Sequence, residues 1–176
     1  MTRLSVNVNK VATLRNARGA NNPNLVEVVR DCEKYGAEGI TVHPRNDERH
    51  ITLKDVYDIA SVVKTDFNIE GFPDKRFLKI IDDIVPEQVT LVPDPPEVLT
   101  SNRGWKKSDI KIDLKKIIKH IQSLGSKVVI FIDPEKEMLE YIKEMGADRV
   151  ELYTCLLYTS DAADEGLGVD LGGRRI

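Results

Sequence analysis

The sequence contains few cysteine, histidine and aromatic residues. It holds two cysteines and three histidines among 176 residues, and aromatic residues make up 6% of the chain. Two cysteines cannot build a disulfide framework, and the His, Cys, Asp and Glu residues nowhere show metal-ligand spacing. We therefore expect a reduced, cytoplasmic protein without a tightly bound metal.

Long apolar runs and an excess of positive charge are also absent. No run approaches the roughly 20 apolar residues that span a bilayer, and the first ten residues lack the apolar stretch of a signal peptide. Lys and Arg total 26 against 29 Asp and Glu, which gives a net charge of -3. The chain therefore has no overall positive field for a nucleic acid, and it has neither GxGxxG nor GxxxxGK[ST]. A local basic pocket for a small anionic ligand remains open.

What the sequence does contain is a regular alternation of β-rich runs and amphipathic helical patterns. Such alternation with strands of about five residues predicts a parallel sheet in an α/β fold, either doubly wound or a barrel. The length is short for a closed (β/α)₈ barrel. The expected strands cover residues 4–9, 39–43, 67–71, 88–93, 127–132 and 149–153, and the expected helices cover residues 24–35, 53–64, 74–85, 114–124 and 135–145.

An internal repeat supports this pattern. The segments KYGAEGITVH, EMGADRVELY and SLGSKVVIFI align without gaps from the end of a helix into the following strand. Gly36, Gly146 and Gly125 occupy equivalent positions in them, where a left-handed residue commonly ends a helix. The repeat therefore predicts repeated βα units.

The alternation within the strands favours a barrel over a doubly wound sheet. A doubly wound sheet is covered by helices on both faces, so its strands should be apolar on both sides. Here one side of several strands is polar, and a polar file suits a barrel interior that holds a polar ligand. The polar residues are Ser5, Asn7, Asn9, Thr41, His43, Asn68, Glu70 and Glu151.

Candidate chemistry lies at the carboxyl ends of the strands, where parallel α/β folds place their active sites. His43 and Glu70 could exchange protons with a substrate, because both side chains can be tuned toward neutral pH. Arg18, Arg45 and His50 could bind a phosphate.

Each candidate has a structural alternative. Arg15, Arg18, Arg45 and Arg49, taken singly, also fit solvated loop charges. Asp133 next to a proline is expected to cap a helix, and His120 on a Lys-rich helix face is expected to be exposed to solvent. For Glu151 the functional and structural readings are evenly balanced.

The order and wording of these segments resemble the pyridoxine 5′-phosphate synthase family of vitamin B6 biosynthesis. The segments VNVNKVATLRNARG, GITVHPRNDERHI, NIEG, LVPDPPEVLTSNRGW, FID and VELYT carry the resemblance, over residues 4–154. It implies a TIM barrel, a transferase that forms homo-oligomers, and no metal or organic cofactor. Composition and charge, as above, predict a cytoplasmic protein with no nucleic acid or membrane partner. The implied reaction condenses 1-deoxy-D-xylulose 5-phosphate with 3-amino-2-oxopropyl phosphate to give pyridoxine 5′-phosphate, phosphate and water.

The resemblance also implies roles for individual residues. His43 and Glu70 correspond to acid/base residues, and Glu151 is a further possible site residue. The segment that contains Pro95, Pro96 and Trp105 corresponds to a lid that excludes water. The implied substrate contacts are Asn7 and Arg18 for the amino-ketone phosphate, and Asn9, Lys10, Arg45, His50 and Thr100 for the ketose phosphate. Many family members have aspartate and histidine where Asn9 and Lys10 stand.

The chain departs from the family pattern after Thr154. Residues 155–176 are expected to form a disordered tail that resembles translated sequencing adapter, so residues 1–154 form an incomplete barrel of about six βα units. We expect the last two units, with a proton-donating histidine and phosphate-binding amides, to be missing and the chain to be poorly stable and weakly active or inactive. A noncatalytic phosphate-binding fragment, or another phosphosugar isomerase or aldolase on the same barrel, remains an alternative.

Overall fold

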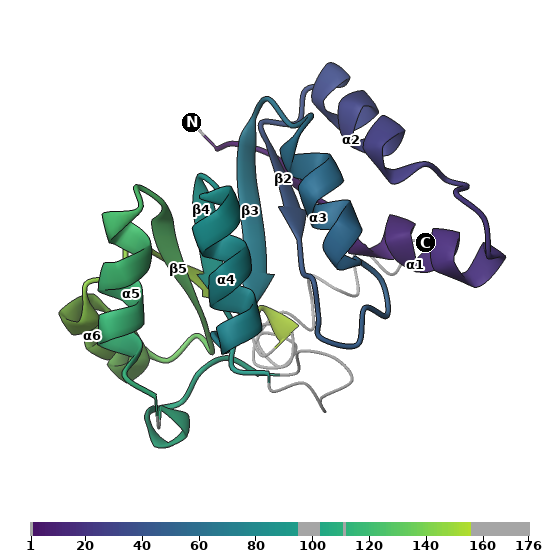
Figure 1. Ribbon diagram of the computed structural model, residues 1–176. Helices are drawn as coiled ribbons and strands as arrows, with labels where there is room; N and C mark the ends of the chain where they lie inside the picture. Colours follow the sequence, from purple (N-terminus) through teal and green to yellow (C-terminus); the bar gives the residue numbers. More distant parts are fainter. Residues whose placement is uncertain (1, 95–102, 111, 156–176) are drawn as a thin grey trace, which may run out of the picture.

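A computed structural model of the chain shows six parallel strands in one curved sheet, in the order β1-β2-β3-β4-β5-β6. The structure describes residues 2–94, 103–110 and 112–155. Every neighbouring pair in the sheet is parallel, as the alternation of strands and helices predicts (Figure 1). The strands are β1 (Ser5–Asn7), β2 (Gly39–Val42), β3 (Asp66–Gly71), β4 (Gln88–Leu91), β5 (Lys127–Ile132) and β6 (Arg149–Leu152).

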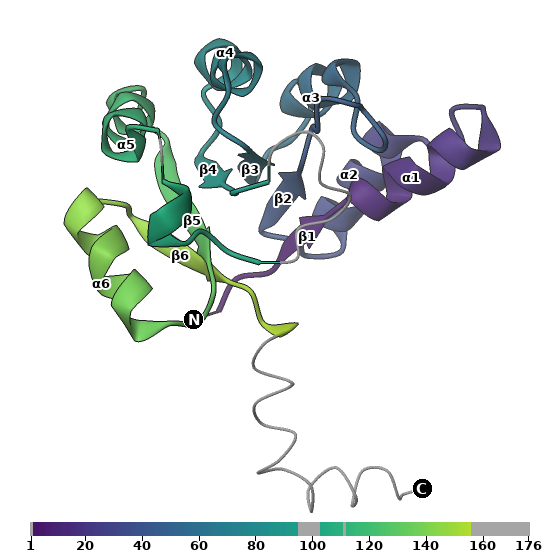
Figure 2. The same cartoon turned by 90° about the horizontal axis from the view of Figure 1, so that it is seen from below.

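Helices alternate with the strands and lie on the outside of the curve. Figure 2 shows α2 to α6 arranged in an arc around the sheet, so that the sheet forms the inner wall of an incomplete barrel. This arrangement confirms the predicted fold class, an incomplete TIM-type α/β barrel. The helices are α1 (Asn9–Arg18), α2 (Leu25–Lys34), α3 (Leu53–Ala60), α4 (Lys75–Ile84), α5 (Leu114–Ser123) and α6 (Lys136–Met145), with a 3₁₀ turn η1 at Lys107–Asp109.

Helix α1 is a correction to the sequence interpretation, which continued the first strand to residue 9 and followed it with a loop. The strand ends at Asn7, and the helix runs from Asn9 to Arg18. Only Ala12 of this helix is buried, so the segment has almost no apolar face that periodicity could reveal. Gly19 in the left-handed conformation ends the helix.

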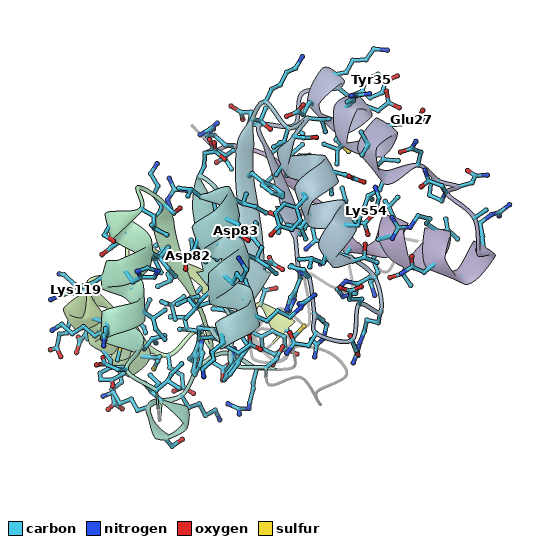
Figure 3. All side chains as sticks on the ribbon, viewed as in Figure 1. Glu27, Tyr35, Lys54, Asp82, Asp83 and Lys119 are labelled. Atoms are coloured by element: carbon cyan, nitrogen blue, oxygen red, sulfur yellow. The ribbon has the colours of Figure 1, made fainter. Side chains whose placement is uncertain are left out.

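The hydrophobic core lies between the outer face of the sheet and the helices. Ile40, Val42 and Ile69 are fully buried there, together with Ile80 and Ile118 from the covering helices. The opposite sides of the helices carry charge, and the labelled Lys54, Asp82, Asp83 and Lys119 project outward in Figure 3. The polar side chains that alternate with the core residues along the strands therefore face the inside of the curve.

Local signals fix the ends of the helices. Gly36, Gly125 and Gly146 all have positive φ angles, at +101°, +101° and +85°, as the repeat predicts. Thr52 begins α3 with a complete capping box to Asp55. The glycines therefore mark where three helices end before the next strand, and Thr52 marks where α3 begins.

Some predictions concern residues outside the described part of the chain. They are the Thr100 contact, the Pro95 and Pro96 part of the lid, and nearly all of the tail at residues 155–176. Among the described residues, no helix has the length and apolarity needed to cross a membrane.

Candidate active site

The candidate site lies where β2, β3 and β4 end. A pocket there is lined by residues at the ends of these strands or within three residues after them, among them His43, Arg45, Gly71 and Asp94. The aromatic rings of Phe72 and Phe77 complete its wall. The carboxyl ends of the strands thus meet at one mouth, as parallel topology requires.

His43 and Glu70 face each other at this mouth. The distance from His43 Nδ1 to Glu70 Oε2 is 3.9 Å, and their side chains are 11% and 14% exposed. The backbone N–H of His43 donates a hydrogen bond of 2.9 Å to Asn9 Oδ1, which ties the end of β2 to the start of α1. The two residues predicted as the acid/base pair are therefore neighbours, and both side chains are largely shielded from solvent.

Burial moves the two pKa values in opposite directions. Desolvation, reinforced by the positive charge of Arg45, lowers the pKa of His43 from 6.5 to about 3. Desolvation, reinforced by the carboxylate of Glu151, raises the pKa of Glu70 from 4.5 to about 8. At neutral pH the site therefore holds an unprotonated imidazole, whose ring nitrogen can accept a hydrogen bond, beside a protonated carboxyl group that can donate one.

A chain of polar side chains crosses the inner face of the sheet below this pair. Thr90 Oγ1 donates to Asn68 Oδ1 at 3.1 Å, and Asn68 Nδ2 donates to Thr41 Oγ1 at 3.3 Å. The Thr41 and Ser5 hydroxyls are 3.0 Å apart, and one of them donates a hydrogen bond to the other. Three residues of the predicted polar file, Ser5, Thr41 and Asn68, thus join Thr90 in a hydrogen-bonded network that connects four strands.

Glu151 extends this network to β6. Burial raises its pKa, and a hydrogen bond with Thr90 opposes part of that rise. Its charge also acts on Glu70. The sequence favoured neither a functional nor a structural role for Glu151. The structure places it close enough to interact electrostatically with Glu70.

Two of the predicted phosphate ligands are close to the acid/base pair. Arg45 is buried, and its Nη1 lies 3.9 Å from Asp94 Oδ2. The His50 ring is centred 6.2 Å from the His43 ring. Burial and the charge of Arg45 lower the pKa of His50, so this side chain is also neutral at pH 7.

The remaining predicted contacts lie on β1 and α1. Asn7 is exposed, and its Oδ1 accepts a hydrogen bond of 2.9 Å from Asn9 N–H. Lys10 is exposed on the first turn of α1, and its charge acts on His50. Arg18 ends α1 as an exposed residue, so its phosphate contact stays a prediction.

The segment around Trp105 differs from the sequence interpretation, which placed this residue in a lid. Trp105 is buried, its N–H donates to Phe131 O, and its indole Nε1 donates to Leu91 O at 3.0 Å. Asp133 does not cap α6, because Glu135 is the N-cap residue and Asp133 Oδ1 accepts a hydrogen bond of 2.7 Å from Gly104 N–H. Trp105 is therefore an anchor on β5, and Asp133 is its support.

Asp94 is a site residue that sequence reasoning missed. It lies three residues after the end of β4, in the connection that leaves the strand, and it is 7% exposed. Its position at a strand end was the available signal, but an aspartate between prolines also fits a turn. Its burial beside Arg45, which the sequence does not show, distinguishes a site residue from a turn residue.

Comparison with known proteins identifies the family. The family described as pyridoxal phosphate biosynthesis protein PdxJ matches residues 4–166. This chain belongs to the PdxJ family. The matched range continues past Thr154, where the resemblance noted from the sequence ended.

Curated relatives of the PdxJ family agree with this assignment. Proteins named pyridoxine 5′-phosphate synthase from Cytophaga hutchinsonii and Porphyromonas gingivalis are each 54% identical over 154 residues. The protein of the same name from Bacteroides fragilis is 54% identical over 157 residues. Each match covers 88% of this chain and 65% of the relative, so the chain spans about two thirds of the length of these PdxJ proteins.

Proposed function

We propose that this chain carries the acid/base half of a pyridoxine 5′-phosphate synthase active site. The reaction joins 1-deoxy-D-xylulose 5-phosphate and 3-amino-2-oxopropyl phosphate and releases phosphate and water. The observation that supports this proposal is the buried pair of His43 and Glu70, 3.9 Å apart, with pKa values moved to opposite sides of neutrality. At neutral pH such a pair keeps a proton on the carboxyl group and leaves the imidazole unprotonated.

The chemistry of the condensation needs both functions. When the amine attacks the ketose carbonyl, a carbon–nitrogen bond forms and the carbonyl oxygen leaves as water after it is protonated. Glu70 in its protonated form supplies a proton to the departing oxygen, and neutral His43 removes one from the attacking or ring-closing group. Glu151 acts electrostatically on Glu70, and in its ionised form it would stabilise the cation that forms on the nitrogen.

Phosphate recognition is assigned to the basic residues around the pair. Arg45 and His50 are the proposed ligands of the ketose phosphate, together with Asn9, Lys10 and Thr100. Asn7 and Arg18 are the proposed ligands of the amino-ketone phosphate. The proposed partners are these two substrates and further copies of the chain, and the proposed location is the cytoplasm.

Product formation tests this function. We would assay the 176-residue chain and a chimera that continues after Thr154 with the corresponding C-terminal part of the Cytophaga hutchinsonii protein. We expect turnover by the chimera, and a loss of about 100-fold or more in kcat for its His43→Gln and Glu70→Gln variants. Exposed Glu144 offers a matched control, because Glu144→Gln makes the same chemical change far from the mouth.

Two outcomes would count against the proposal. Unchanged turnover in both the His43→Gln and Glu70→Gln chimeras would remove these residues from the chemistry. Binding of 1-deoxy-D-xylulose 5-phosphate without turnover by the chimera would favour a noncatalytic phosphate-binding role.

A further inference from the structure

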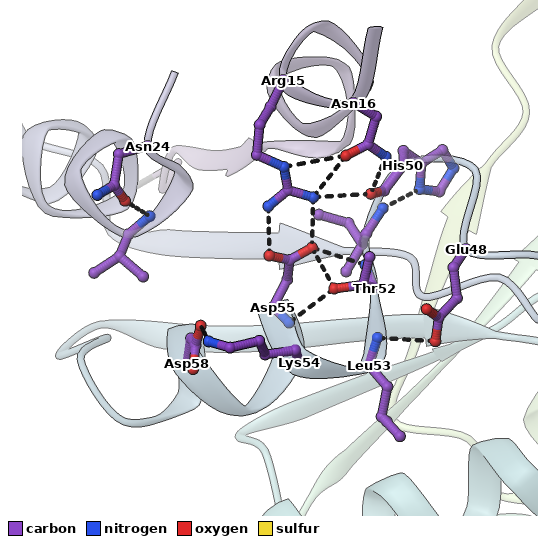
Figure 4. A network of polar contacts seen from close by, with 12 residues as sticks. Arg15, Asn16, Asn24, Glu48, His50, Thr52, Leu53, Lys54, Asp55 and Asp58 are labelled. Atoms are coloured by element: carbon purple, nitrogen blue, oxygen red, sulfur yellow. Dashed lines mark hydrogen bonds and ion pairs between the residues drawn. The ribbon is translucent and has the colours of Figure 1, made fainter. Parts of the chain in front are cut away.

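A nearly buried ion pair lies beside the candidate site and joins α1 to α3. Arg15 and Asp55 are connected through both oxygens of the carboxylate, and Arg15 Nη2 lies 2.8 Å from Asp55 Oδ2 (Figure 4). Their side chains are 12% and 10% exposed. Arg15 is therefore not a solvated loop charge, and its guanidinium faces Asp55.

Asp55 also takes part in the cap at the start of α3. Its Oδ2 accepts hydrogen bonds of 2.8 Å from both the N–H and the hydroxyl of Thr52. Burial opposes ionisation of Asp55, but the hydrogen bonds from Arg15 and Thr52 outweigh it and lower its pKa. The carboxylate thus fixes the guanidinium of Arg15 relative to the first turn of α3.

Arg15 in turn orients the side-chain amide of Asn16. Asn16 Oδ1 accepts from Arg15 Nε at 3.1 Å and from Arg15 Nη2 at 2.9 Å. This leaves the Asn16 Nδ2 group to donate to the backbone carbonyl of His50 at 2.9 Å. Arg15 Nη2 reaches the same carbonyl at 3.4 Å, so two donors hold one oxygen.

The peptide group that contains this carbonyl also fixes the imidazole of His50. The N–H of Ile51 belongs to the same planar unit as the His50 carbonyl, and it donates to His50 Nδ1 at 2.9 Å. A nitrogen that accepts this bond carries no proton, so the proton of the neutral ring lies on Nε2. Rotation of the peptide plane would break the bonds at both of its ends.

We infer that Arg15, Asn16 and Asp55 form a positioning network for His50: by holding the His50–Ile51 peptide plane they keep the imidazole in its Nε2–H form, as a donor to an oxygen of a phosphorylated ligand. The three residues act through the backbone and need not touch the ligand themselves. The identity of the ligand rests on the proposed function, whereas the tautomer does not.

The tautomer can be measured on the 176-residue chain by nitrogen NMR of labelled imidazoles. The chain has only three histidines, His43, His50 and His120, so substituting His43 and His120 by glutamine identifies the His50 signals. We expect the Nε2–H form for His50 in the unaltered chain. Arg15→Lys keeps the charge but removes the fork that orients Asn16, so it should increase the Nδ1–H population.

Asn16→Ala is the sharper variant, because Asn16 is exposed and its loss leaves the buried ion pair intact. It should shift His50 toward the Nδ1–H form and weaken binding of 1-deoxy-D-xylulose 5-phosphate by about threefold to tenfold, the effect of one hydrogen bond. Thr13→Ala is the matched control on α1, since Thr13 Oγ1 bonds only the carbonyl of Asn9 one turn earlier among the described contacts. It should change neither quantity.

An unchanged His50 tautomer in folded Asn16→Ala and Arg15→Lys proteins would overturn the inference, even if their melting temperatures fell. An Nδ1–H form in the unaltered chain would overturn it as well. Absence of ligand binding by the unaltered chain, with the expected tautomer shifts present, would count against the proposed function and leave the network supported.

Discussion

Substituting Glu70 by glutamine should stabilise the folded chain at alkaline pH. Moving the pKa of Glu70 from 4.5 to about 8 makes its ionised form less favourable in the folded state by about 5 kcal/mol, since one pKa unit corresponds to about 1.4 kcal/mol. The folded state then binds more protons than the unfolded state, so its stability falls as pH rises through this interval. Between pH 5 and pH 8 the loss attributable to Glu70 is about 3 to 4 kcal/mol.

Urea unfolding followed by tryptophan fluorescence at several pH values measures this loss. The Glu70→Gln protein should lack most of the decline between pH 5 and pH 8, and at pH 8 it should be more stable than the unaltered chain. Glu144→Gln should keep the full decline, because Glu144 is exposed. Parallel pH profiles for the unaltered and Glu70→Gln chains would refute the claim that burial at the mouth holds Glu70 protonated.

Further predictions concern His43 and Gly104. Acidification from pH 7 to pH 4 should lower the free energy of unfolding by about 3 kcal/mol through His43, because the pKa of its ring is about 3 in the folded state and 6.5 in the unfolded state. His43→Gln should remove this loss. Equal acid sensitivity of the unaltered and His43→Gln chains would contradict this prediction. Gly104→Ala should destabilise the fold in urea by about 2 to 4 kcal/mol, because a Cβ there would lie 2.1 Å from the Ile132 backbone and would break the hydrogen bonds of the Trp105 anchor. Gly125→Ala meets no atom within 4 Å and should cost only the left-handed penalty, about 1 kcal/mol, so equal losses at both glycines would contradict the clash.

The strands were predictable because alternating polar and apolar residues identify both the element and its faces. Strand β5 was predicted to the residue at Lys127–Ile132, although both of its faces are apolar, because the glycine-capped repeat marks where it begins. The inward file through Thr41 and Asn68 was also readable, since residues two apart share a face. Helix α1 was missed because a helix with one buried residue gives no periodic signal.

The sequence predicted several residues of the candidate site, but it did not predict the contacts between them. His43 and Glu70 follow from their places at strand ends, whereas their separation depends on how far the sheet curls. Arg15 was treated as one of several loop arginines, because a long-range partner such as Asp55, 40 residues away, leaves no local pattern. Charge pairs of this kind are visible only once helices are packed.

The only tryptophan of the chain lies at the edge of the candidate site. Its indole stacks on Phe72 with ring centres 6.0 Å apart, and Phe72 lines the same pocket as His43 and Arg45. A ligand that settles between these side chains must alter the surroundings of the Phe72 ring and, through it, of the indole. Trp105 thus provides an intrinsic optical signal by which occupancy of the mouth can be followed in a cuvette, without a label.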